Sequence, residues 1–119
     1  MRKSLFFSIL LFFALSPIQA QTWIDSLDRY GREVYMPAEK YVWDWGQATF
    51  LNSLIHLYQT KPASEKSKYL QYIRTAMDKT YDVANGKHPN AIASGIGMAF
   101  LARVTKEEKY KINNLNFKL

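Results

Sequence analysis

Apolar residues recur at helical spacing through the middle of the chain and predict three helices. Between positions 47 and 58, apolar side chains lie three, four and seven residues apart, which places most of them on one side of a helix. Pro62 follows this stretch and predicts its end. A second helix is predicted over residues 64–81, before the turn-forming pair Asn85-Gly86. A third is predicted over residues 91–104.

The third predicted helix contains Gly95 and Gly97, which cost an isolated helix about 1 kcal/mol each. Two such residues indicate a close approach by another backbone or by a ligand. Immediately after this helix, Thr105 and Glu108 have the spacing of a capping box, in which each side chain bonds to the backbone N–H of the other residue. This motif predicts a fourth helix that starts near Lys106.

Similar residues follow the first and third predicted helices and form an internal repeat. Thr60 and Thr105 lie 45 positions apart, and Tyr69 and Tyr110 lie 41 apart. A period of this length suits one helical hairpin. The pattern therefore predicts an all-α fold of antiparallel helical hairpins laid side by side. Two hairpins are few for burying their apolar faces, and residues 111–119 are rich in Asn, so we expect an array that is cut short.

The first twenty residues have the order of a cleavable export signal. Two basic residues precede the apolar run 5–15, and Ala20 supplies the small residue expected before a cleavage site. As a helix the run would rise only about 16 Å, roughly half of the ~30 Å hydrocarbon layer, so a retained membrane anchor is the weaker interpretation. We expect a signal peptide over residues 1–20 and a mature protein over residues 21–119. That protein would be periplasmic or secreted, with no membrane association after cleavage.

Composition narrows the expected partners. The chain has no cysteine, so the mature protein can form no disulfide and carries no lipid-modified cysteine; it must be held together by core packing. The net charge is +6, and loss of Arg2 and Lys3 would leave 14 basic and 10 acidic side chains, a charge of +4. This basicity is mild, and no run of basic residues with interleaved aromatics indicates a nucleic-acid surface.

The segment just before the first predicted helix is a candidate sugar-binding site. It contains Trp43, Asp44, Trp45 and Gln47. Aromatic faces cover the apolar C–H patches of a sugar, and neighbouring polar groups bond its hydroxyls. The alternative is that both tryptophans belong to the core and that Asp44 caps the helix.

A second polar cluster precedes the third predicted helix and contains His88 and Asn90. In a hairpin array this cluster would lie at the same end as the tryptophans, so the two together predict a pocket. The alternative is a solvent-facing His88 and an Asn90 that caps the helix. His56 lies between Ile55 and Leu57 within a helix, and we interpret it as structural.

Several kinds of chemistry lack the required residues. Two isolated histidines without cysteine give no metal-ligand spacing, and neither a glycine-rich phosphate loop nor a Gly-x-Ser-x-Gly motif is present, so no metal or cofactor is expected. Asp44 could act as a general acid or base, but the pattern places no second carboxylate opposite it. The catalytic residue is therefore left open.

Three segments together resemble a known enzyme family. They are Trp-Asp-Trp-Gly-Gln at residues 43–47, Leu-Tyr-Gln-Thr at 57–60 before Lys-Tyr-Leu at 68–70, and Asn-Ala-Ile-Ala-Ser-Gly at 90–95 before Thr-Lys-Glu-Glu-Lys-Tyr. They look like segments of the unsaturated glucuronyl and rhamnogalacturonyl hydrolases, glycoside hydrolase families 88 and 105. The likeness covers about residues 41–110 and implies part of an (α/α)6 toroid built from six helical hairpins.

The resemblance also implies an activity. Such enzymes hydrate the double bond of an unsaturated uronic acid left by a polysaccharide lyase, with an aspartate as general acid and base. Trp45 matches an aromatic residue that lines the sugar site. Asn90 falls where family members often have an active-site aspartate, and an amide cannot exchange a proton as a carboxyl group does. The aspartate that serves as catalyst in the rhamnogalacturonyl branch would lie beyond residue 119.

Two hypotheses follow for the whole chain. The first is an N-terminal fragment of an exported glycoside hydrolase that binds oligosaccharides containing unsaturated uronic acid and is inactive alone. It predicts that the nucleotide sequence beyond the codon for Leu119 encodes further helical hairpins. The second is a small secreted helical-repeat binding module for a glycan or a peptide, which would fold cooperatively as residues 21–119.

The export signal gives the first testable prediction. The protein recovered after expression in a bacterial host should lack residues 1–20, because cleavage is expected after Ala20. Intact-mass measurement and N-terminal sequencing of the exported protein test this. A mass that still includes these residues would instead indicate a membrane-associated protein that keeps its N-terminal helix.

Overall fold

The computed structural model describes residues 21–84 and 86–111, and the regular elements among them are all helical. The predicted all-α class is therefore confirmed. The chain divides after Tyr35 into two compact units.

The first unit contains a helix over residues 21–30 that continues into a π-helical turn, Gly31–Tyr35. Asp28 and Arg32, one helical turn apart, form a bidentate ion pair with N–O distances of 2.9 and 3.1 Å. The exposed apolar residues of this helix recur at helical spacing and are Trp23, Ile24, Leu27 and Tyr30. No secondary structure was predicted for residues 21–35 from the sequence.

The second unit contains four helices: α2 (Trp45–Thr60), α3 (Ala63–Thr80), α4 (Pro89–Ala93) and α5 (Gly95–Thr105). Single 3-10 turns precede α2, follow α3 and follow α5; these are Ala38–Lys40, Tyr81–Val83 and Glu108–Tyr110. The first two predicted helices are confirmed as α2 and α3, with each end within two residues of the predicted position.

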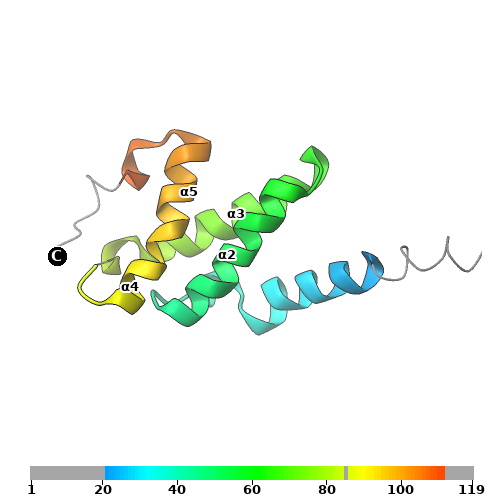
Figure 1. The fold of residues 1–119 in the computed structure, drawn as a ribbon, viewed down its shortest axis with the longest axis horizontal. Coiled ribbons are helices and arrows are strands. Elements are labelled where there is room, and N and C mark those ends of the chain that lie inside the picture. The colour runs from blue at the N-terminus through cyan, green and yellow to red at the C-terminus, as the bar shows by residue number, and fades with distance from the viewer. Residues whose placement is uncertain (1–20, 85, 112–119) are drawn as a thin grey trace, which may run out of the picture. The chain divides into compact units, whose positions relative to one another are not determined.

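The link between α2 and α3 consists of Lys61 and Pro62. The amide of Lys61 bonds to the carbonyl of Leu57 at 2.9 Å and completes the last turn of α2, while Pro62 has no N–H with which to continue it. In Figure 1, α3 runs back behind α2, and α5 lies beside α2. Helix α3 therefore packs against both α2 and α5.

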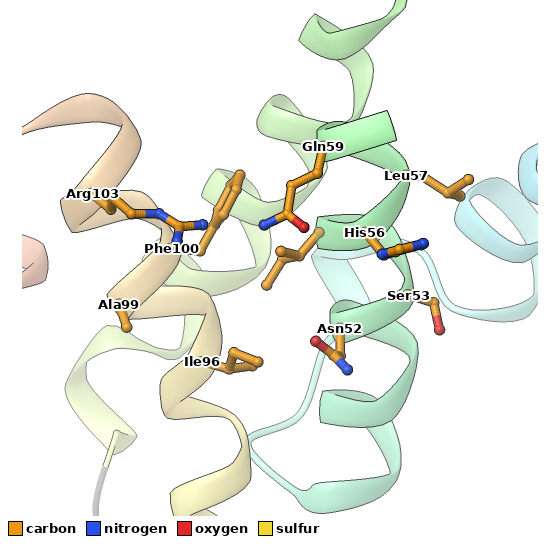
Figure 2. A pocket seen from close by; sticks show the side chains of 10 residues that line it. Asn52, Ser53, His56, Leu57, Gln59, Ile96, Ala99, Phe100 and Arg103 are labelled. Atoms are coloured by element: carbon orange, nitrogen blue, oxygen red, sulfur yellow. The ribbon is translucent and has the colours of Figure 1, made fainter. Parts of the chain in front are cut away.

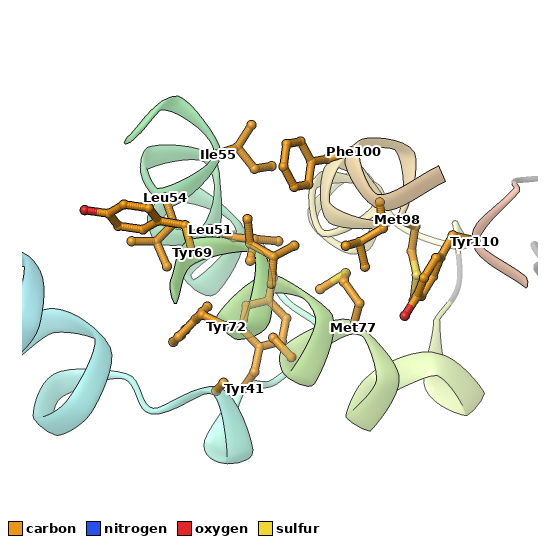
Figure 3. Close-up of a cluster of buried hydrophobic side chains, with 14 of the residues drawn as sticks. Tyr41, Leu51, Leu54, Ile55, Tyr69, Tyr72, Met77, Met98, Phe100 and Tyr110 are labelled. Carbon is orange, nitrogen blue, oxygen red and sulfur yellow. The ribbon is translucent and has the colours of Figure 1, made fainter. Parts of the chain in front are cut away.

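The core of the second unit lies where these three long helices meet (Figure 3). Each contributes fully buried side chains: Leu51 and Leu54 from α2, Tyr69, Ile73 and Met77 from α3, and Met98 and Leu101 from α5. Burial of a side chain of this size contributes about 1.5–3 kcal/mol relative to its exposure. Hydrophobic packing between the helices is therefore the main stabilising contribution.

The third predicted helix is broken at Ser94 into α4 and α5, so the prediction of one continuous helix is wrong. The expectation for Gly97 also needs correction. A Cβ atom at this position would lie 2.5 Å from Met77 Sδ and 2.6 Å from Leu51 Cδ2. Glycine is therefore required at position 97 because buried side chains pack there. The close neighbour is neither another backbone nor a ligand.

The predicted capping box does not form. Helix α5 ends at Thr105, and Lys106 adopts a left-handed conformation with φ 61°. The Thr105 hydroxyl accepts a hydrogen bond from the amide of Glu107 at 3.3 Å, one residue earlier than the motif requires. The 3-10 turn Glu108–Tyr110 stands where a fourth helix was predicted, and residues 112–119 lie outside the described part of the chain.

Polar contacts hold this 3-10 turn against α3. The Asp78 carboxylate accepts hydrogen bonds from Lys109 Nζ at 3.0 Å and from the Tyr110 hydroxyl at 2.6 Å. Arg74 Nη1 pairs with Glu107 Oε1 at 2.5 Å. The Tyr110 side chain is fully buried, and its burial raises the pKa of its hydroxyl above the ordinary value. The exposed ion pairs contribute little, so the buried ring is the principal anchor.

The close packing at Gly97 predicts the sign of two Gly→Ala substitutions. Gly97→Ala should destabilise the protein by about 1–3 kcal/mol, because the added methyl group overpacks Met77 and Leu51. Gly46→Ala is the matched control in α2, where a Cβ would meet nothing within 4 Å. It should stabilise by about 0.4–1 kcal/mol. Urea unfolding measures both, and equal effects would contradict the packing described.

Candidate functional site

Trp43 and Trp45 have different environments where α2 begins. Trp43 is buried in the core with 9% of its surface exposed, whereas Trp45, the first residue of α2, is 56% exposed. The burial of Trp43 agrees with the alternative that it is a core residue. Of these two tryptophans, Trp45 is therefore the one whose ring a ligand can reach. Gln47 is half-buried in the first turn of the same helix.

Asp44 occupies the position before α2 in an extended conformation. Its carbonyl oxygen accepts a hydrogen bond from the amide of Ala48 at 3.0 Å, but its carboxylate makes no capping hydrogen bond. Asp44 therefore stands at the cap position without capping through its side chain. Its exposed carboxylate lies next to Trp45 in the sequence and is open to a ligand.

His88 caps α4. Its Nδ1 accepts a hydrogen bond from the amide of Asn90 at 3.3 Å, which requires an unprotonated Nδ1. Pro89 occupies the first position of the helix, where its missing N–H costs nothing. The alternative assignment of Asn90 as the cap is therefore wrong: His88 has that role. Both side chains are exposed.

A buried serine connects the segment before α2 with the junction between α4 and α5. The Ser94 hydroxyl donates to the Asp44 carbonyl oxygen at 3.0 Å and also lies 3.0 Å from the Tyr41 hydroxyl. Ser94 is fully buried and Tyr41 is 1% exposed. Burial, which disfavours the charged phenolate, raises the pKa of Tyr41 above its ordinary value of 10. These bonds, together with the contacts between α2 and α4, hold the segment that contains Asp44 close to α4, the helix that His88 caps.

A hollow of about 310 Å³ lies beside Trp45 and is lined also by Ala48, Thr49, Asn52, Ala93 and Ile96. It adjoins a larger cleft of about 870 Å³ between α2 and α5 (Figure 2). Asn52 and Ile96 line both, so the two hollows are neighbours, and we refer to them together as the groove. Of the residues predicted to bind a ligand, Trp45 is the one that lines it.

The groove contains polar residues that the sequence analysis did not assign to a site. His56, interpreted as structural, is exposed and lines the larger cleft. Gln59 and Arg103 also line it. A signal was available in the sequence, because the groove side of α2 carries residues at helical spacing: Trp45, Thr49, Asn52, His56 and Gln59.

The groove is lined by apolar and polar side chains and by Arg103. None of its described lining residues is an Asp or Glu, so it offers no carboxyl group for acid or base catalysis. Within residues 21–84 and 86–111, no cluster of three or more His, Cys, Asp or Glu residues could hold a metal ion. Across the same residues, no helix combines the length and hydropathy needed to cross a membrane.

Comparison with known proteins found no similarity. No family model matches the chain, and neither a curated protein nor a solved structure matches it.

The Tyr41–Ser94 pair predicts an asymmetric effect on stability. Ser94→Ala leaves a buried tyrosine hydroxyl without its partner and should cost about 1–3 kcal/mol. Tyr41→Phe should cost less, about 1 kcal/mol, because Ser94 keeps its bond to the Asp44 carbonyl. The double variant should lose less than the two single losses added together. Urea unfolding at pH 7, where Tyr41 is neutral, measures all three, and strictly additive losses would contradict the coupling.

Proposed function

We propose that this chain is part of an exported helical glycosidase and that its groove binds an oligosaccharide containing unsaturated uronic acid. The observation that carries the proposal is the exposed ring of Trp45 at the edge of a hollow. An aromatic face open at one side of a concave surface can stack on the C–H face of a sugar. The carboxylate of Asp44 and the amide of Asn52 are hydrogen-bonding groups suited to its hydroxyls.

The internal repeat supports a hairpin architecture for this glycosidase. Thr60 is the last residue of α2, and Thr105 is the last residue of α5. Each hydroxyl donates to the carbonyl oxygen four residues earlier, at 3.0 Å to His56 and at 2.8 Å to Leu101. Thr60 and Thr105 therefore end α2 and α5, the helices that the repeat relates, with the same kind of hydrogen bond, which also ends α3 at Thr80. The support for a helical hairpin as the repeating unit comes from the 45-residue spacing of the two threonines.

In this proposal the described residues bind the substrate and do not catalyse its hydration. Hydration of a carbon–carbon double bond needs a group that gives a proton to one carbon and a group that activates water. The groove contains no carboxyl group, and the exposed Asn90 cannot replace one. The acid and base would come from other hairpins of the toroid.

The alternative proposal is a small secreted helical-repeat module that binds a glycan or a peptide. It is favoured by the packing of the second unit, whose three long helices all contribute fully buried side chains to one core. Such a module would unfold cooperatively by itself, whereas a piece of a toroid with an unpartnered apolar face would aggregate or stay molten. Calorimetric unfolding therefore discriminates between the two.

The sugar-stacking role of Trp45 can be tested by isothermal titration calorimetry. The full chain should bind an unsaturated uronic acid disaccharide produced by a polysaccharide lyase. Trp45→Ala should weaken this binding by about three- to tenfold, because it removes the stacking surface.

The matched control is Trp23→Ala, which removes a tryptophan that is 71% exposed in the first unit and lines neither hollow. This variant should bind as the parent protein does. No binding by the parent protein, or equal losses in both variants, would overturn the proposal.

A further inference from the structure

The larger cleft between α2 and α5 contains one charged side chain, and we infer that it forms a subsite for a carboxylate. The charged residue is Arg103, and none of the other nine residues that line the cleft is an Asp, Glu, Lys or Arg. The inference rests on the proposed function, since the carboxylate is taken to belong to a sugar unit. It assigns the recognition of ligand charge to residues at the opposite end of the groove from Trp45.

Arg103 and Gln59 face each other across this cleft. Arg103 comes from the last turns of α5 and Gln59 from the last turn of α2, and their side chains point toward one another (Figure 2). Both groups carry N–H donors. No ion pair among the described side chains involves Arg103. A carboxylate placed between them would accept hydrogen bonds from both, and the planar guanidinium can bond it with two parallel N–H groups.

The floor of the cleft is apolar and held in place. Phe100 is 3% exposed, and its ring packs edge-on against Tyr58 at a centroid distance of 5.1 Å. Ile55 and Ile96 line the cleft beside it. An apolar floor lowers the local dielectric constant and strengthens a charge pair formed above it. It also offers a surface for the C–H face of the sugar that carries the acid.

The helix ends give the main opposing effect. Helices α2 and α5 both end near Arg103 and Gln59, and a helix C-terminus carries partial negative charge that disfavours an anion. Arg103 is exposed, so a single hydrogen bond to an anion would contribute little against the two helix ends. The favourable contribution at this subsite comes from the two parallel bonds of a bidentate pair formed above the apolar floor.

The length of the groove separates the two ends of the ligand. Trp45 and Gln59 are fourteen residues apart on α2, which corresponds to about 21 Å along the helix. The hollow beside Trp45 and the cleft at Arg103 are neighbours that share Asn52 and Ile96 as lining residues. A sugar stacked on Trp45 and an acid bound at Arg103 are therefore different units of one oligosaccharide.

Titration of the full chain with two matched probes tests the subsite. The probes are a short unsaturated oligogalacturonide and its fully methyl-esterified form, which has the same sugar units without the charges. The parent protein should bind the acid about tenfold more tightly than the ester. Arg103→Gln should reduce this preference to about one, with little change in binding of the ester. Lys79→Gln, which makes the same charge change at an exposed residue of α3 outside the cleft, should keep the preference.

A second variant tests the role of Gln59, which faces Arg103 across the cleft. Gln59→Glu places a carboxylate opposite Arg103 and should abolish the preference for the acid, because the new side chain occupies the guanidinium and repels the ligand. Equal binding of both probes by the parent protein, or an unchanged preference in Arg103→Gln, would overturn the subsite while leaving sugar binding intact. Failure of the parent protein to bind either probe would overturn both the subsite and the proposed function.

Discussion

The contact of Gly97 with Met77 and Leu51 determines how the long helices of the second unit meet. With no Cβ at position 97, α5 approaches the side chains of Met77 and Leu51 so closely that any larger residue would require them to shift. This approach places Met98 and Leu101 in the shared core while the opposite side of α5 faces the groove. The width of the groove is therefore a consequence of the packing behind it, because the helices that line it are positioned by their buried sides.

Local periodicity was sufficient to locate α2 and α3, but it did not indicate the tertiary contacts at the junction of α4 and α5. Ser94 keeps helical backbone angles at this junction, and its hydroxyl is bonded to Tyr41, 53 residues earlier, and to the carbonyl of Asp44. No pattern within a short window contains that information. The same limit applies to Gly97, whose neighbours come from two other helices. The capping-box motif at Thr105 was recognisable, but a left-handed Lys106 shifted the hydrogen bond by one residue.

The candidate site was predicted in part for a similar reason. The pair of tryptophans before a helix could be recognised in the sequence. Although the two are only two residues apart, Trp43 lies in the core and Trp45 lies at the surface. His56 was interpreted as structural because Ile55 and Leu57 flank it, yet adjacent positions on a helix face different directions. Arg103 lies on another helix, so its place opposite Gln59 follows only from tertiary packing. The sequence therefore indicated the end of the groove at Trp45, whereas the end at Arg103 follows from the tertiary structure.

The division of α2 into a packed side and an open side separates stability from specificity. Leu51, Leu54 and Ile55 are buried, so most changes at these positions would reduce the population of folded protein. Asn52, His56 and Gln59 are exposed, and substitutions there change what the groove presents while costing little folding free energy. The open side of this helix can therefore be changed by successive mutations without passing through unfolded intermediates, which makes this surface a favourable starting point for directed evolution.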